Sequence, residues 1–117
     1  MRLKSEIWVK AYIRLCTGSG RPAAVVRHGD DDAGTIFIRV NRLDGTSLLF
    51  GPSPAGLGFA AEDRRWMARL LPTGNPDATI DDYLEREFKS DPDIWIIEVE
   101  ARDGVHLLDD WLIGTAP

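Results

Sequence analysis

The feature that most constrains this fold is the pair Asp44-Gly45, which lies between two runs of strand-forming residues. Asp-Gly readily adopts the positive φ angles of a two-residue hairpin turn. The run before it, residues 35–43, alternates apolar and polar side chains, and the run after it, residues 46–50, is mostly apolar. The sequence therefore predicts a β-hairpin near the middle of the chain.

Three further segments have the composition of strands. Residues 23–28 form a short apolar run, and residues 94–101 alternate between an apolar face and a face that ends in charged side chains. Residues 64–71 fit a helix or a strand, and their alternation favours a strand. The turn pair Asp103-Gly104 follows, after which residues 105–112 are expected to add a short strand or a helical turn.

Two segments have helical spacing. In residues 5–16 the apolar positions recur every three or four residues, and Ser5 is the expected N-cap. The second helix is predicted to start at Thr79-Ile80-Asp81-Asp82, which resembles a capping box. It is expected to end at Asp91-Pro92-Asp93. Residues 51–58 contain two prolines and three glycines, which predicts a loop.

This order of elements predicts an α+β fold, in which a mostly antiparallel sheet of four to six strands carries two helices packed on one face. The other face is then left to solvent, to the loop 51–58, or to a second copy of the chain. At 117 residues, we expect a single domain over 1–117.

Cysteine content and hydropathy limit the location and the cofactors. Cys16 is the single cysteine, so we expect a buried apolar residue and neither an intrachain disulfide nor a cysteine-based zinc site. No stretch approaches the ~20 apolar residues of a membrane span, and the N-terminus lacks the pattern of a secretory signal. We expect a cytoplasmic protein with no membrane partner, no metal and no cofactor.

The charge is divided unevenly along the chain. Residues 1–71 carry 11 Lys or Arg and 7 Asp or Glu, whereas residues 72–117 carry 3 and 12, and the net charge is −5. The two halves are expected to pair across their contact. The alternative is a basic surface for an anionic partner.

Two groups of residues are candidates for a site. Glu98, Glu100 and Arg102 project to one side of the predicted strand that contains Trp95, so they are a candidate binding surface or pocket. The alternative is a ladder of ion pairs to Arg39, Arg65 or Arg69. The second group consists of arginines on the predicted strands, which would suit single-stranded nucleic acid: Arg27, Arg39, Arg42, Arg64, Arg65 and Arg69.

Other arrangements carry little chemistry. The turn from His28 to Gly34 holds three consecutive aspartates, which point apart and are expected to be solvated rather than to bind a metal. The two histidines are His28 and His106, and no serine occupies a nucleophile elbow. No catalytic residue is predicted.

Several short motifs resemble those of a known family. They are Arg27-His28-Gly29-Asp30 with Ala33-Gly34, Asn41-Arg42-Leu43-Asp44-Gly45, Asp63-Arg64-Arg65, and Asp91-Pro92-Asp93-Ile94-Trp95 with Glu98-Val99-Glu100 and Arg102-Asp103-Gly104. The chain resembles the domain of unknown function family 1491, small proteins of alphaproteobacteria, over nearly its whole length. The resemblance implies a bacterial cytoplasmic protein of one domain, and it implies no activity, cofactor or catalytic residue.

The leading hypothesis is a small non-enzymatic interaction module that binds a protein partner or another copy of itself. Four tryptophans, an uncovered sheet face and oppositely charged halves favour it. The alternative is a small enzyme or ligand-binding protein with a pocket near the Glu98, Glu100 and Arg102 face. A nucleic-acid binder is a third hypothesis, and we do not expect it.

Overall fold

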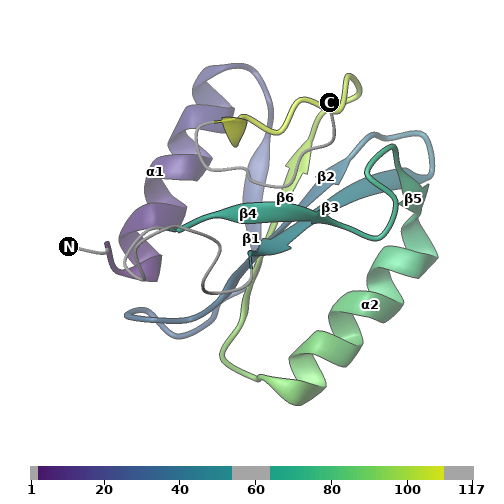
Figure 1. Ribbon diagram of the computed structural model, residues 1–117. Helices are drawn as coiled ribbons and strands as arrows, with labels where there is room; N and C mark the ends of the chain where they lie inside the picture. The colour runs from purple at the N-terminus through teal and green to yellow at the C-terminus, as the bar shows by residue number, and fades with distance from the viewer. Residues whose placement is uncertain (1–2, 54–63, 110–117) are drawn as a thin grey trace.

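The computed structural model describes residues 3–53 and 64–109, which form two helices and six strands (Figure 1). In chain order the elements are α1 (Ser5–Gly18), β1 (Ala23–Arg27), β2 (Ile36–Asn41), β3 (Thr46–Pro52), β4 (Trp66–Arg69), β5 (Asn75–Pro76), α2 (Asp77–Ser90) and β6 (Trp95–Glu100). The strand predicted for residues 64–71 is confirmed by β4, and the predicted loop 51–58 is wrong at its start because β3 continues through Pro52.

The strands form one mixed sheet in the order β1-β6-β2-β3-β4, with β5 paired to β3. The pairs are antiparallel except β2 with β6, which runs parallel from Ile36↔Trp95 to Asn41↔Glu100. The α+β fold and the mostly antiparallel sheet are therefore confirmed. The parallel pair places β6 between β1 and β2, so Glu98 and Glu100 lie on an inner strand of the sheet.

The two helices cover opposite faces of the sheet, so the prediction that both pack on one face is wrong (Figure 1). Trp8, Tyr12 and neighbouring residues of α1 pack on one face, called here the α1 face. Ile80 and Leu84 of α2 pack on the other, called the α2 face. The central strands are apolar on both sides, as strands buried between two layers are. Within the described residues, both faces of the central strands are covered, so the uncovered face expected for a second copy is not found there.

The alternation of the strands explains how the two cores divide. Ile38 and Ile97 point to the α1 face, whereas Phe37, Leu49 and Ile96 point to the α2 face. Fewer apolar residues of the strands point to the α2 face than to the α1 face, because polar side chains occupy the remaining α2-face positions of β2 and β6. This mixture of apolar and polar positions is typical of a solvent-facing surface, which is why one uncovered sheet face was predicted.

The hairpin between β2 and β3 is confirmed, but its turn is longer than predicted. The Arg42 N–H donates to the Thr46 carbonyl at 3.1 Å, which leaves three residues in the turn. Leu43 has φ 62° and Gly45 has φ 89°, and the Asp44 carboxylate accepts the Thr46 N–H at 2.9 Å. The extra residue places the Leu43 side chain outside the hairpin.

Helix α1 begins at Ser5, as its predicted range has it, but the predicted N-terminal caps of both helices are wrong. The cap position of α1 is Lys4, and the hydroxyl of Ser5 instead donates to the Gly34 carbonyl at 2.7 Å from a fully buried position. Helix α2 begins at Asp77, two residues before the proposed box at Thr79, with Pro76 at its cap position. The hydroxyl of Ser5 is used by its hydrogen bond to the Gly34 carbonyl, and Asp81 of the proposed box pairs with Arg39.

The segment after β6 returns across the α1 face. Leu108 is fully buried in the core beside α1, and the Tyr12 hydroxyl donates to the His106 carbonyl at 2.6 Å. Residues 110–112 of the predicted terminal element lie outside the described residues. Neither described helix has the length and apolar character that crossing a membrane requires.

Candidate functional site

Arg39 is the centre of a group of ion pairs that ties α2 to the sheet. Its side chain is 11% exposed on the α2 face, and it pairs with Asp77 at 3.1 Å, with Asp81, and with Glu98 at 3.7 Å. Its Nε also donates to the Ser47 hydroxyl at 3.2 Å. The predicted cross-strand pair between Glu98 and Arg39 is therefore present.

The environment of Arg39 keeps it charged. Burial alone would lower the pKa of Arg39, but hydrogen bonds to Asp81 and Asp77 outweigh burial and raise it. All three carboxylates belong to the acidic part of the sequence, residues 72–117. For this cluster, the expected pairing between the two oppositely charged halves is confirmed.

Arg65, Arg69 and Trp95 hold backbone in place. Arg65 donates to the Arg64 carbonyl at 3.0 Å, and Arg69 donates to the Pro52 carbonyl across β3 and β4. Trp95 is 2% exposed on the α1 face, and its indole N–H donates to the Asp30 carbonyl at 2.8 Å. The sheet therefore separates Trp95 from Glu98, which lies on the α2 face.

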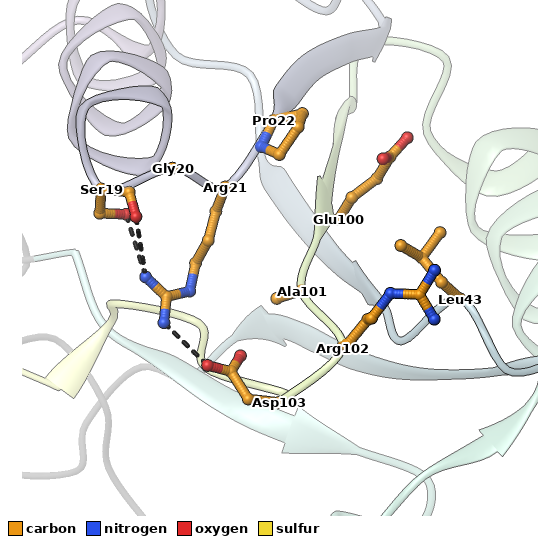
Figure 2. Close-up of a pocket in the computed structure, with 9 residues that line it drawn as sticks. All are labelled: Ser19, Gly20, Arg21, Pro22, Leu43, Glu100, Ala101, Arg102 and Asp103. Carbon is orange, nitrogen blue, oxygen red and sulfur yellow. Dashed lines mark hydrogen bonds and ion pairs between the residues drawn. The ribbon is translucent and has the colours of Figure 1, made fainter.

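Glu100 and Arg102 lie apart from these contacts and line an open groove at the end of the sheet (Figure 2). Both are exposed, and within the described parts of the chain neither forms an ion pair or a side-chain hydrogen bond. The groove has a volume of about 390 Å³. Its other lining residues are Ser19, Gly20, Arg21, Pro22, Leu43, Ala101 and Asp103.

One wall of the groove is fixed by an ion pair between Arg21 and Asp103 at 2.9 Å (Figure 2). Arg21 also donates to the Ser19 hydroxyl at 3.2 Å. Asp103 accepts the Val105 N–H at 3.1 Å, and this bond, followed by the one from Arg21, lowers the pKa of the Asp103 carboxyl. The opposite wall is Leu43, from the turn between β2 and β3.

The free edge of the sheet at β1 begins beside this groove. Among the described residues β1 is the terminal strand of the sheet, and it pairs with β6 on its inner side. The Glu100 N–H donates to the Pro22 carbonyl at 2.8 Å, which fixes the alternation of the ladder. Ala24 then directs its backbone groups to β6, whereas Ala23 and Val25 direct theirs outward.

Sequence reasoning identified Glu100 and Arg102 but missed the groove walls and the free edge. Arg21 and Leu43 come from connections far apart in the sequence, and although Leu43 lies in one of the family motifs, neither residue was predicted to form a site. A signal for the edge was present, since β1 reads Ala-Ala-Val-Val-Arg and lacks the lysine or proline that commonly protects an edge strand. The sequence did not show that this strand lies at the edge of the sheet.

No metal centre or proton-transfer site emerges from the described segments. None of their His, Cys, Asp and Glu residues form a group of three or more that could hold a metal. His28 contacts Asp31 at 2.5 Å on the surface, and that hydrogen bond lowers the pKa of Asp31. Cys16 is buried, and burial raises the pKa of its thiol, which makes it a poor nucleophile.

Comparison with known proteins matches the chain to one protein family and to several solved structures. The family profile described as "Protein of unknown function (DUF1491)" matches residues 3–109. No curated protein matches the chain.

Two solved structures are similar over almost their whole length. A crystal structure of a DUF1491 family protein from Caulobacter crescentus is 36% identical with a TM-score of 0.79, and the match covers 97% of this chain and 100% of that one. The solution structure of protein Atu0922 from A. tumefaciens is 34% identical with a TM-score of 0.79, covering 100% and 98%.

Proposed function

The chain belongs to the DUF1491 family of proteins of unknown function, and we propose that it is a non-enzymatic interaction module that binds an extended segment of a partner protein along the free edge of β1. The observation that carries this proposal is the outward direction of the Ala23 and Val25 backbone groups. In the described chain these groups have no hydrogen-bond partner in another element. An added strand would satisfy them.

The side chains of this edge are apolar and exposed. Val25 is 41% exposed and Val26 is 62% exposed, and no charged residue precedes Arg27 within the strand. A bulge between Val25 and Arg27 ends the regular ladder, so the edge available for pairing is short. A short apolar edge suits a segment of a few residues, anchored by backbone hydrogen bonds and valine contacts.

The charges beside the edge favour a different protein over a second copy. Ile13 marks the flank of α1 that packs toward the core shared with Ala23 of β1, and α1 contacts β1. Lys10 and Thr17 lie three and four residues from Ile13 and share that flank. Lys10 pairs with Glu6 at 2.8 Å, and a segment with acidic side chains would share this cation, whereas a second copy would bring another basic flank beside it.

The same arrangement disfavours nucleic acid. The arginines of the predicted basic group are dispersed and occupied: Arg27 stacks on Phe88 at 3.5 Å, Arg42 donates to the Thr73 carbonyl at 3.3 Å, and Arg64 donates to the Leu3 carbonyl at 2.6 Å. Arg39 is held by carboxylates. A nucleic-acid surface needs basic side chains that are free to reach phosphates along one path.

The test is a selection of phage-displayed random peptides on the purified protein, followed by amide chemical-shift mapping of the strongest binder. We expect selected peptides to contain alternating apolar and acidic residues and to shift the amides of Ala23 and Val25. The substitution Val25→Pro removes one outward N–H and should weaken binding about tenfold.

The matched control is Ala68→Pro on the opposite edge strand, β4. Ser53 pairs with Arg65 through its N–H at 2.9 Å, so the alternation directs the Ala68 backbone away from β3. We expect this variant to bind the selected peptide within about twofold of wild type. Failure to select any peptide, or shifts confined to other elements, would refute the proposal.

A further inference from the structure

We propose that the groove at the end of the sheet binds a small zwitterion with an apolar side chain, such as a free apolar amino acid or a dipeptide of such residues. This inference is independent of the β1 edge. It rests on Glu100, Arg102 and Leu43, which lie on the side of the groove opposite the Arg21–Asp103 pair (Figure 2).

The two charges at the groove suit a zwitterionic ligand. Glu100 and Arg102 carry opposite charges, and in the described segments neither has a charged or hydrogen-bonded side-chain partner. Glu100 ends β6, Arg102 lies in the turn that follows, and both line the groove, which allows one small molecule to reach both side chains. A ligand carboxylate would pair with the guanidinium of Arg102 and a ligand ammonium with the carboxylate of Glu100.

Leu43 provides an apolar contact at the groove wall. This residue has φ 62°, a conformation that non-glycine residues seldom adopt, and its side chain is 41% exposed. The strained turn therefore holds an apolar side chain at the groove wall beside the two charges. With Ala101 and Pro22, which also line the groove, Leu43 offers apolar contact to the side chain of an amino acid.

The wall opposite Leu43 is fixed by an ion pair before any ligand binds. Arg21 and Asp103 pair with each other at 2.9 Å and hold their own loops through Ser19 and Val105. A ligand need not break this pair, and binding does not require the wall to be ordered. The volume of about 390 Å³ is large enough for an amino acid or a dipeptide.

The experiment uses three probes that share the isobutyl side chain of leucine. Leucine carries both charges, isocaproate carries only the carboxylate, and isoamylamine carries only the ammonium. Titration of the labelled full chain should shift the amides of Leu43, Glu100 and Arg102 with leucine, and the two singly charged probes should bind several times more weakly. The dipeptide Leu-Leu is tested in parallel, and the tighter of the two zwitterions identifies the ligand size.

The variants Glu100→Gln and Arg102→Gln should each weaken leucine or dipeptide binding about two- to fivefold, as expected for exposed ion pairs. Glu85→Gln and Arg86→Gln make the same charge changes at exposed positions of α2 and should leave binding unchanged. Three outcomes would overturn the proposal: no shifts with either zwitterion, equal binding of isocaproate, or equal effects of the groove and α2 variants.

Discussion

The hydroxyl of Tyr12 donates a hydrogen bond to the backbone carbonyl of His106 at 2.6 Å, across 94 residues of sequence. This contact ties helix α1 to the segment that follows β6. The His106 ring lies edge-on to Phe50, with the ring centroids 4.8 Å apart, and its Nδ1 accepts the Leu108 N–H at 2.9 Å. The neutral imidazole therefore holds the turn that buries Leu108.

This geometry predicts a pH dependence of stability. Burial lowers the pKa of His106 below its usual 6.5, while Asp109 opposes the shift. The unfolded chain then binds a proton at higher pH than the folded chain does, so the free energy of unfolding should fall as pH drops below about 6.5. Protonation would also remove the acceptor for the Leu108 N–H.

The measurement is denaturant unfolding of wild type and His106→Asn at about pH 7.5 and pH 5.5. Because the carboxylates titrate in both proteins, the contribution of His106 is the difference between their pH dependences. Wild type should lose more stability than the variant over this interval. Equal losses would show that His106 does not couple protonation to folding.

Removing the guanidinium of Arg39 should destabilise the fold. Arg39→Met leaves Asp77, Asp81 and Glu98 near one another without their shared cation, and we expect the free energy of unfolding to fall by about 1–3 kcal/mol. The carboxylates are partly solvated, which keeps the loss below that of a fully buried pair. Chemical denaturation of wild type and Arg39→Met measures this loss in the free energy of unfolding.

The control for this prediction is Arg86→Met, an exposed arginine of α2. Its substitution should change stability by less than about 0.5 kcal/mol. If Arg39→Met is equally mild, the ion-pair cluster does not hold α2 to the sheet.

Gly29 should not tolerate a side chain. A Cβ at this position would lie 2.3 Å from the Asp93 carbonyl oxygen and 2.7 Å from Cδ1 of Trp95. Gly29→Ala should therefore destabilise the protein by about 1–3 kcal/mol, because the neighbouring backbone must move. Thermal unfolding of this variant should show a clearly lowered Tm.

Gly18 provides the matched control, since a Cβ there would meet no atom within 4 Å. Gly18→Ala should preserve or raise the Tm because alanine is the better helix residue. If both alanine variants unfold at the wild-type temperature, the close approach at Gly29 has no energetic importance.

Local signals in the sequence were sufficient for most elements. The alternation on both sides of Asp44-Gly45 predicted β2 and β3, and helical spacing predicted α1 and α2. The side on which each helix packs could not be predicted, because Phe37, Leu49 and Ile96 are too few to distinguish a second core from a partly solvated face. The parallel pairing of β2 with β6 depends on a long-range choice that no turn motif records.

The candidate site was predictable only in part. Period-two spacing placed Glu98 and Glu100 on one side of a strand, which the structure confirms. It could not show that Arg39 pairs with Glu98 while Glu100 has no such partner, because that difference depends on where α2 lies. The groove also needs Arg21 and Leu43, which the fold brings together from two separate connections.

The position of β6 has a consequence for the order of assembly. This strand is the last of the described strands, yet it lies between β1 and β2. During synthesis, a nascent chain that stops before Trp95 has no neighbour for β1 and lacks half of the contacts of β2. We therefore expect the emerging polypeptide to stay incompletely folded on the ribosome until β6 is released, and then to close in one cooperative step.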